Sequence, residues 1–203
     1  MPLMGRGRRR VRDLVTAALL IGAVTVTAAA LQDWNSRTLE GTAVVTDGDT
    51  IRLMGEPVRL RGIDAPELEQ LCIGGDGAEH ACGRLSSAYL ETLIAARPVA
   101  CIGHDTDRYG RFLGDCRAGA GATATDLNEA MVASGWAVAY GDHERAEARA
   151  RGDKRGLWAW EFERPADWRR RVAAETGESV PAGGAGAFVR RARALVGWSG
   201  HNE

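Results

Sequence analysis

Short runs of valine, isoleucine and leucine alternate with turn residues over residues 41–67. The segment GTAVVTDGDTIRLMGEPVRLRGIDAPE contains three such runs, which are separated by Asp47-Gly48 and by Gly55-Glu56-Pro57. Asp-Gly is a strong signal for a tight hairpin, and glycine with proline marks a second turn. The pattern predicts three strands that form an antiparallel meander.

Three later stretches have the character of helices. Leu85, Tyr89 and Leu93 repeat every four residues, which predicts an amphipathic helix over 83–96 that Pro98 ends. TDLNEAMVASGWA predicts a second helix and HERAEARARGDKRGLW a third, each with capping signals at its ends. Between the first two helices, VACIG and RFLGDCRA predict a hairpin.

The order of meander, helix, hairpin, helix and helix favours an α+β fold, mainly a five-stranded barrel of the oligonucleotide-binding type with three helices. We assign this domain to residues 41–163. Residues 164–203 are expected to form a largely flexible C-terminal extension, with little packed structure beyond Trp160. The extension contains a Gly-, Ala- and Pro-rich linker around 181–186 and a short basic amphipathic helix over 188–198.

Residues 1–34 are typical of an export segment. Five arginines precede an uncharged apolar run from Leu14 to Leu31. The run is near the minimum length for a membrane span, and the small residues at 28–30 suit a signal peptidase, so a cleaved signal and an uncleaved anchor over 14–31 both stay open. A core helix of a cytoplasmic protein is disfavoured, because it would not need an arginine-only leader. We expect a periplasmic, secreted or membrane-anchored protein.

The charge balance argues against a basic nucleic-acid clamp. The chain has a formal net charge of −1, and residues 1–30 hold five arginines and one aspartate, so the remainder carries about −5. Tight passive binding to nucleic acid normally requires many lysine and arginine contacts with phosphates. The balance leaves room for a local arginine site that acts on a phosphate together with a bound cation.

Four cysteines follow the export segment, and an even number in an oxidising compartment predicts two disulfides. Three pairings are possible. We favour Cys72 with Cys82, which closes a glycine-rich loop, and Cys101 with Cys116, which joins two strands. Zinc binding by Cys72, His80 and Cys82 is the alternative, but this spacing matches no common zinc pattern.

Acidic residues gather at the ends of two predicted strands. Antiparallel pairing places Asp49, at the start of the second strand, beside Asp64, at the end of the third. With Glu67 they form a cluster of hard oxygen ligands suited to calcium or magnesium. Ordinary turn chemistry and a surface ion-pair network are the competing explanations. Whether Arg59 shares their face depends on a one-residue register that the sequence leaves open.

Three motifs occur in a fixed order: DGDTIRL, VRLRGIDAPE and, beyond the first helix, DRYGRFL. Together they resemble the staphylococcal nuclease family, also called thermonucleases, over about residues 41–160. RGLWAWEFERPADWRR is similar to the closing segment of bacterial members. The resemblance implies a calcium-dependent phosphodiesterase on an oligonucleotide-binding barrel, which cuts DNA and RNA to leave 3′-phosphates.

The resemblance also implies roles for particular residues. Asp49 and Asp64 would bind calcium through their carboxylates, and Ala65 through its backbone carbonyl. The family often has threonine at the position of Ala65, but a carbonyl ligand tolerates the change. Glu67 would act as the general base that takes a proton from the attacking water.

Arginines and tyrosines of the same motifs would contact the substrate. Arg59 and Arg111 would grip the scissile phosphate, because their planar forks match its oxygens. Arg108, Tyr109 and Tyr140 align approximately with positions that contact a terminal phosphate or base. For Tyr140, a buried or half-buried structural aromatic is the competing explanation.

One stretch departs from the family pattern. Residues 68–83 form an acidic, cysteine-bounded loop where the staphylococcal enzyme has a lysine-rich one, so substrate affinity is expected to be lower or differently placed. The overall prediction is an exported, monomeric, calcium-dependent nuclease acting on DNA or RNA. A catalytically inactive nucleic-acid-binding barrel of the same fold is the alternative. It is disfavoured because Arg59, Glu67 and Arg111 all accompany the two aspartates.

Overall fold

The computed structural model describes residues 12–25, 27 and 36–176. The strands are β1 (Arg37–Gly41), β2 (Ala43–Val45), β3 (Thr50–Leu53), β4 (Glu56–Leu60), β5 (Ile63–Asp64), β6 (Cys72–Ile73), β7 (Glu79–His80), β8 (Val99–Thr106), β9 (Phe112–Ala118), β10 (Thr125–Asp126) and β11 (Val138–Ala139). The labelled helices are α2 (Cys82–Ile94), α3 (Leu127–Ala133), α4 (Glu144–Gly152) and α5 (Pro165–Thr176), with single 3-10 turns at Gly121–Thr123 and Gly156–Ala159. Residues 12–25 are also helical.

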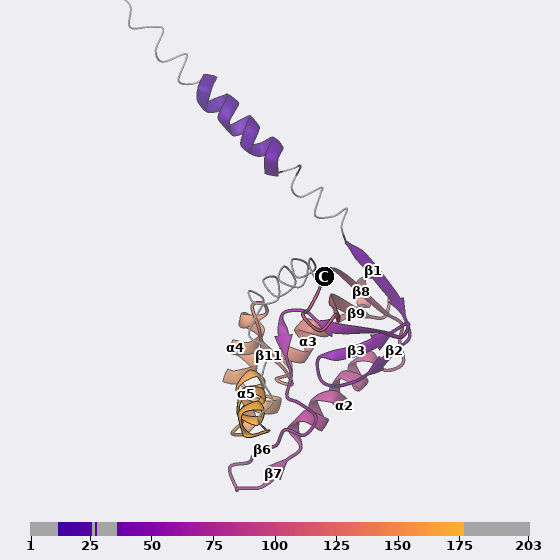
Figure 1. Cartoon of the computed structure of the whole chain (residues 1–203), viewed down its shortest axis with the longest axis vertical. Helices are drawn as coiled ribbons and strands as arrows, with labels where there is room; N and C mark the ends of the chain where they lie inside the picture. The colour runs from indigo at the N-terminus through magenta and orange to yellow at the C-terminus, as the bar shows by residue number, and fades with distance from the viewer. Residues whose placement is uncertain (1–11, 26, 28–35, 177–203) are drawn as a thin grey trace, which may run out of the picture.

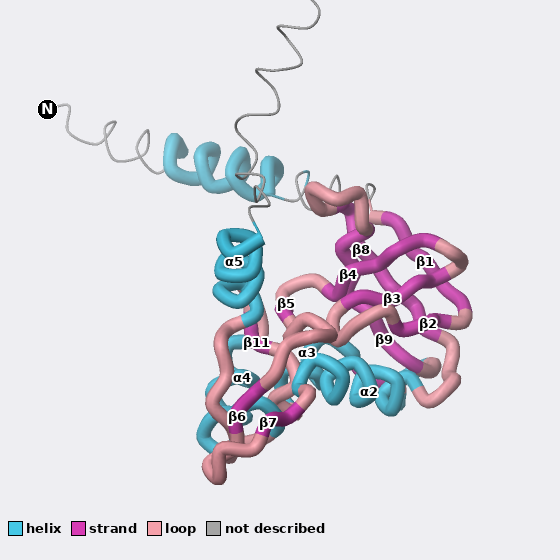
Figure 2. Tube along the Cα trace, turned by 60° about the horizontal axis from the view of Figure 1, so that its bottom comes forward, coloured by secondary structure: helices cyan, strands magenta, loops and turns pink. Residues whose placement is uncertain are grey.

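The main sheet curls because one segment supplies both of its edges. Its strand order is β1-β8-β9-β4-β3-β2, with β10 paired to β9. β1 and β2 are separated only by Thr42, yet they lie at opposite ends of this order. A nearly continuous strand can reach both edges only if the sheet closes toward a barrel, and Figure 2 shows this curl.

The α+β architecture agrees with the prediction, although the strands are subdivided. Counting β1 and β2 as one interrupted strand, the barrel is formed by this strand with β3, β4, β8 and β9, and the short β10 extends it. The helices α2 and α3 lie along one side of the curled sheet (Figures 1 and 2). The core between them is apolar and includes Ile51, Leu60, Leu90, Leu127 and Met131.

The meander fixes the register that the sequence left open. β3 pairs with β4 so that Ile51 faces Val58 and Thr50 faces Arg59. Ile51 and Val58 are fully buried in the core. Because side chains alternate along a strand, Arg59 leaves the sheet on the face opposite to Val58. The strand pairing thus directs Arg59 away from the apolar core.

The core face of α2 differs from the predicted one. Beyond the buried Cys82 and Gly83 at its start, the helix buries Ser86, Leu90 and Ile94, each one residue after a member of the Leu85, Tyr89 and Leu93 repeat. Leu85 is largely exposed, whereas Tyr89 and Leu93 pack at the edge of the core. Ser86 is tolerated inside because its hydroxyl donates a hydrogen bond to the carbonyl of Trp136, at 2.7 Å.

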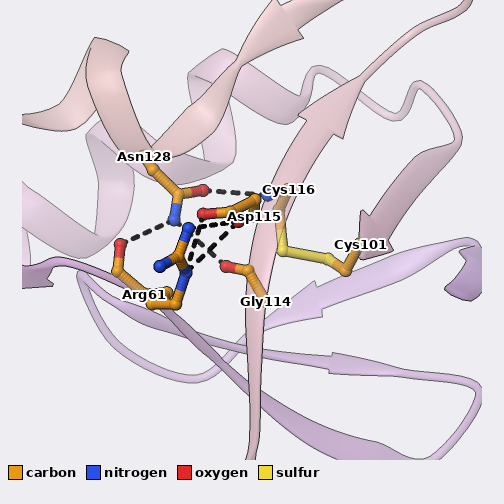
Figure 3. Close-up of a disulfide and its surroundings, with 6 residues drawn as sticks. All are labelled: Arg61, Cys101, Gly114, Asp115, Cys116 and Asn128. Carbon is orange, nitrogen blue, oxygen red and sulfur yellow. Dashed lines mark hydrogen bonds and ion pairs between the residues drawn. A yellow bond between two sulfur atoms is a disulfide. The ribbon is translucent and has the colours of Figure 1, made fainter. Parts of the chain in front are cut away.

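Both favoured disulfides are present. Cys101 and Cys116 are direct neighbours across β8 and β9, and their sulfurs are bonded (Figure 3). Cys72 is bonded to Cys82 and closes the loop that contains β6 and β7. The zinc alternative is therefore wrong, since both of its cysteine sulfurs are consumed by the disulfide.

Residues 161–176 correct the expectation of little packed structure beyond Trp160. They include α5, which begins at the buried Pro165. Proline suits the first turn of a helix because it needs no hydrogen-bond acceptor there. The helix is rich in arginine and lacks a continuous apolar stripe, so its pattern did not predict packing. The predicted linker at 181–186 and basic helix at 188–198 lie outside the described residues.

The predicted export segment is described only in part. Residues 12–25 are helical and exposed, and most other positions of 1–34 lie outside the described residues. Within the part of the chain that the structure describes, no helix has the length and apolar character needed to cross a membrane.

A buried asparagine joins α3 to the sheet (Figure 3). The Asn128 side chain accepts a hydrogen bond from the backbone N–H of Cys116 at 2.9 Å. Its amide nitrogen donates to the carbonyls of Arg61 at 2.8 Å and Gly114 at 3.1 Å. One side chain therefore bonds to three backbone groups, two of which belong to the buried residues Gly114 and Cys116.

We predict that Asn128→Ala lowers the free energy of unfolding by about 1–3 kcal/mol, because it removes three hydrogen bonds and takes away the side-chain partner of the buried Cys116 N–H. Urea unfolding under oxidising conditions measures the change. Thr92→Ala, an exposed position on α2, is the control and should stay within about 0.5 kcal/mol of the parent. Equal stability of the two variants would contradict this role of Asn128.

Candidate active site

A cleft of about 1120 Å³ opens beside the end of the β3–β4 hairpin. It is lined by the turn before β3, the end of β4, the turn and loop around β5, the turn after β8 with the start of β9, the residues after β11, and one face of α5. The lining includes Asp49, Arg59, Asp64, Ala65, Glu67, Arg108, Tyr109, Arg111, Tyr140, Arg169 and Arg170. All the residues predicted to bind metal or substrate or to act in catalysis therefore share one cavity.

Two buried carboxylates converge on one guanidinium. Asp49 and Asp64 are each only 3% exposed. The Nη1 atom of Arg59 lies 2.8 Å from Oδ1 of Asp49, and its Nη2 atom lies 2.7 Å from Oδ1 of Asp64. The predicted meeting of the two aspartates is thus present, and Arg59 lies on their face of the sheet.

Close backbone packing positions Asp49. Its Oδ2 atom accepts a hydrogen bond from the backbone N–H of Ala65 at 2.9 Å, and the Thr50 hydroxyl contacts Oδ1 at 3.0 Å. The preceding residue, Gly48, packs so tightly that an added Cβ would lie 2.1 Å from the Ser86 hydroxyl and 2.7 Å from Cβ of Ala65. The glycine between the two aspartates of DGD allows this approach.

Burial raises the pKa of Asp49 to about 7, from 3.8. The Arg59 guanidinium and the Ala65 N–H oppose this rise, whereas the neighbouring charges of Asp47 and Asp64 add to it. Desolvation outweighs the ion pair because the carboxylate is almost completely removed from water. The site therefore favours either a proton or an additional cation at Asp49.

Glu67 lies on the loop after β5 and points into the same cleft. Its backbone is pressed against the start of α2, where a Cβ at Gly83 would meet the Glu67 carbonyl oxygen at 1.8 Å. Its side chain is 37% exposed and ion-paired to Arg169, with 2.8 Å between Oε1 and Nη1. The backbone position of Glu67 is thus fixed by packing, and its carboxylate is held by an arginine from α5.

Sequence reasoning missed Arg169. Its Nη2 atom lies 3.1 Å from Oδ1 and 3.0 Å from Oδ2 of Asp64. Partial burial lowers the pKa of Arg169, but the hydrogen bonds to Asp64 and Glu67 outweigh this and raise it, so the guanidinium stays charged. The sequence signal that could have identified Arg169 was the similarity of RPADWRR to the closing segment of bacterial family members. No residue of that segment was given a role in the sequence analysis.

Arg111 enters the cleft from the turn after β8. Its Nε and Nη2 atoms lie 2.8 and 2.7 Å from Oδ2 of Asp107. Its Nη1 atom lies 3.4 Å from the hydroxyl of Thr50, the neighbour of Asp49. Partial burial raises the pKa of Asp107, but hydrogen bonds from Arg111 and Tyr109 lower it overall. The turn therefore holds Arg111 near the carboxylates through an ion pair with the ionised Asp107.

The two tyrosines of the cleft are exposed. Tyr109 is 60% exposed, and the guanidinium carbons of Arg108 and Arg111 lie 4.8 and 5.4 Å from its ring centroid. Tyr140 is 72% exposed and follows β11, which pairs with β5. The competing explanation of Tyr140 as a buried or half-buried aromatic is wrong.

The donor set fits a hard cation with limited protein ligation. Within the described residues, no group of three or more His, Cys, Asp and Glu side chains is arranged to hold a metal. Asp49 and Asp64 supply two converging carboxylates, whose oxygens are bonded to Arg59, Arg169 and the Ala65 N–H in this structure. Oxygen donors of this type suit calcium or magnesium, with water filling the other positions.

Comparison with known proteins places this chain in a family. The family model described as "Staphylococcal nuclease homologue" matches residues 57–160, about half of the chain. The chain belongs to the staphylococcal nuclease family. Membership confirms the predicted family and, with the curled sheet, the oligonucleotide-binding type of barrel. Asp49 precedes the matched segment of this nuclease homologue, and α5 follows it.

Three relatives indicate the range of the family. The chain is 39% identical over 124 residues to "Succinoglycan biosynthesis protein ExoI" of Rhizobium meliloti (strain 1021), covering 58% of this chain and 63% of that protein. It is 34% identical over 125 residues to an "Uncharacterized endonuclease" of Escherichia coli O157:H7, covering 57% and 73%. It is 33% identical over 120 residues to "Probable staphylococcal-like nuclease CAN2" of Oryza sativa subsp. japonica, covering 56% and 29%. The last two of these proteins carry endonuclease or nuclease names, and the chain spans less than two thirds of the length of the first.

We predict that Asp49→Asn stabilises this chain in calcium-free buffer. An unfolded aspartate loses its proton near pH 3.8, and folded Asp49 near 7. Between these values the folded state holds a proton that the unfolded state has lost, so stability falls as pH rises from about 4 to 7. The substitution should flatten this fall and raise the free energy of unfolding at pH 8 by about 1–4 kcal/mol.

Urea unfolding between pH 4 and 8 measures this effect of Asp49. Asp153→Asn, at an exposed carboxylate, is the matched control and should follow the parent protein. A lower stability of Asp49→Asn than of the parent at pH 8 would contradict the electrostatic description.

Proposed function

We propose that this protein is an exported, calcium-dependent nuclease that hydrolyses phosphodiester bonds of DNA or RNA and leaves 3′-phosphates. One observation carries the proposal: two buried carboxylates, a third carboxylate and several arginines converge in a single cleft. Family membership and the endonuclease names of relatives support the reaction class. The calcium requirement, the products and the export are part of the proposal.

Asp49, Asp64 and the carbonyl of Ala65 are the proposed calcium ligands. The support is the pair of converging carboxylates and the raised pKa of Asp49, which marks a site where added positive charge is favourable. When bound, calcium supplies positive charge that stabilises the phosphate as negative charge builds on it. The two aspartates also keep Arg59 in place through their ion pairs.

Glu67 is the proposed general base. It lines the cleft on the loop that follows Asp64, and its Oε1 atom is occupied by Arg169. Within the described residues, no side chain bonds to Oε2, so this oxygen is available to take a proton from an attacking water. A carboxylate can do so directly or through one intervening water.

Arg59 and Arg111 are the proposed phosphate ligands. A guanidinium has five N–H donors, and each arginine uses only some of them in hydrogen bonds to its carboxylate partners. The remaining donors can bind phosphate oxygens, and their charge stabilises the five-coordinate transition state more than the substrate. Arg111 is also assigned to assist departure of the 5′-oxygen.

Arg108, Tyr109 and Tyr140 are the proposed contacts to flanking nucleotides. The exposed rings of the two tyrosines lie in the cleft wall, where bases can stack on them. Such contacts are tolerant of sequence, because every base presents an aromatic face. They suit an enzyme that acts on DNA and RNA without sequence specificity.

Export is supported by the arginine-rich leader and by the two disulfides. Disulfides persist in oxidising compartments, so both features point to the same location. A cleaved signal and a tether over 14–31 remain the two forms of this proposal, and a monomer is the proposed state.

We predict that the purified chain digests single-stranded DNA with calcium and that Glu67→Gln lowers kcat by about 10²–10⁴-fold, because the amide cannot accept the proton. Chelation should abolish digestion. Glu175→Gln, at an exposed residue of α5, is the matched control and should retain the parent rate.

Release of acid-soluble nucleotides measures activity, and end-group analysis identifies the phosphate position. Full digestion in chelator would contradict the calcium requirement. A parent protein that binds the oligonucleotide but never cleaves it would instead support the inactive binding barrel.

A further inference from the structure

A single arginine outside the matched family segment touches two of the carboxylates in the cleft. The Nη1 atom of Arg169 lies 2.8 Å from Oε1 of Glu67, and its Nη2 atom lies 3.0–3.1 Å from both oxygens of Asp64. The matched segment ends at 160, whereas Arg169 lies nine residues later on α5. The cleft is therefore completed by a segment that follows the matched residues.

The connection to α5 is tied to the rest of the fold. Glu161 exchanges two backbone hydrogen bonds of 2.9 Å with Ile73, next to the Cys72–Cys82 disulfide. The side chain of Gln70 donates to the carbonyl of Glu163 at 2.6 Å. The disulfide-closed loop, which departs from the family pattern, thus holds the chain that leads into α5.

Further contacts fix α5 at its first turn. Arg164 is ion-paired to Glu147 of α4, with 3.3 Å between Nη2 and Oε2. Pro165 is buried. In Figure 2, α5 lies beside β11 and β5, and β5 contains Asp64. An arginine on such a supported helix can hold a partner in a defined position.

We propose that Arg169 is a positioning residue that orients the Glu67 carboxylate for proton transfer and aligns it with Asp64. This inference rests on the proposed nuclease function. Arg169 acts through Glu67 and Asp64, so it is distinguished from Arg59 and Arg111, which are assigned to the substrate.

The geometry of the ion pair carries the proposal. Glu67 is partly exposed, and a glutamate without partners moves among many rotamers. Within the described part of the chain, Arg169 supplies the only side-chain hydrogen bond to Glu67. It occupies Oε1 and leaves Oε2 open, so the contact orients the base without covering its second oxygen.

The planar fork of arginine also sets the spacing of the two carboxylates. One nitrogen contacts Glu67 and the other contacts Asp64, so the separation of these groups is matched to a rigid guanidinium. A lysine at this position would place one charge near both groups but could not reproduce the fork. Arg169→Lys should therefore retain only part of the function.

The test compares Arg169→Ala and Arg169→Lys in the full chain at saturating calcium. We expect kcat on single-stranded DNA to fall about 10–100-fold for Arg169→Ala, with KM within about 3-fold, and the lysine variant to be intermediate. Methylguanidinium added to Arg169→Ala should restore part of the turnover. Arg171→Ala, at an exposed residue of the same helix, is the control and should keep the parent kcat.

A second readout does not depend on activity. Fluorescence anisotropy of a labelled single-stranded oligonucleotide in chelator should give a Kd for Arg169→Ala within about 3-fold of the parent. Weaker binding with unchanged kcat would overturn the proposal in favour of a substrate contact. Faster turnover at lower calcium would overturn it in favour of an inhibitory contact.

Folding and the proposed function are controlled separately in this design. The thermal unfolding midpoint of each variant establishes that it is folded before its rate is compared. An inactive parent protein would reject the nuclease function itself. An active parent with an equally active, folded Arg169→Ala would reject only the positioning role.

Discussion

The site depends on the antiparallel register of β3 and β4. Because Thr50 is paired with Arg59, the apolar partners Ile51 and Val58 face the core and Arg59 faces the cleft. A shift of one residue would place Arg59 in the barrel and expose the valine. The hydrophobic effect therefore selects the register, and the register places a guanidinium between Asp49 and Asp64. Burial of Ile51 and Val58 in the core thus determines that the Arg59 guanidinium neutralises the two carboxylates of the site.

The sequence was sufficient to predict the meander, the convergence of the two aspartates and the disulfide partners. Each prediction used a local rule: a tight turn determines which strand ends meet, and a short loop or hairpin brings cysteines together. The direction of Arg59 was not predictable in this way, because both registers satisfy the same turn signals. The buried face of α2 was also missed, since Ser86 occupies a core position through its hydrogen bond to the Trp136 carbonyl.

The local rules also could not predict that α5 contributes Arg169 to the site. Arg169 meets Glu67 and Asp64 across more than one hundred residues of sequence, through polar contacts rather than an apolar stripe. Periodicity detects helices that bury a hydrophobic face, and α5 buries little besides Pro165. The acidic, cysteine-bounded loop was recognised only as a departure from the family, yet its backbone pairs with the chain that leads to α5. Two unusual features of the sequence thus form one structural unit.

The most direct measurement is a crystal structure of the full chain grown with calcium. The predicted result is one calcium ion bound by the carboxylates of Asp49 and Asp64 and the carbonyl of Ala65, with Arg59 still on the cleft face of the sheet. A calcium ion bound elsewhere, or none at this position at saturating calcium, would contradict the proposal that the β3–β4 register builds a cation site.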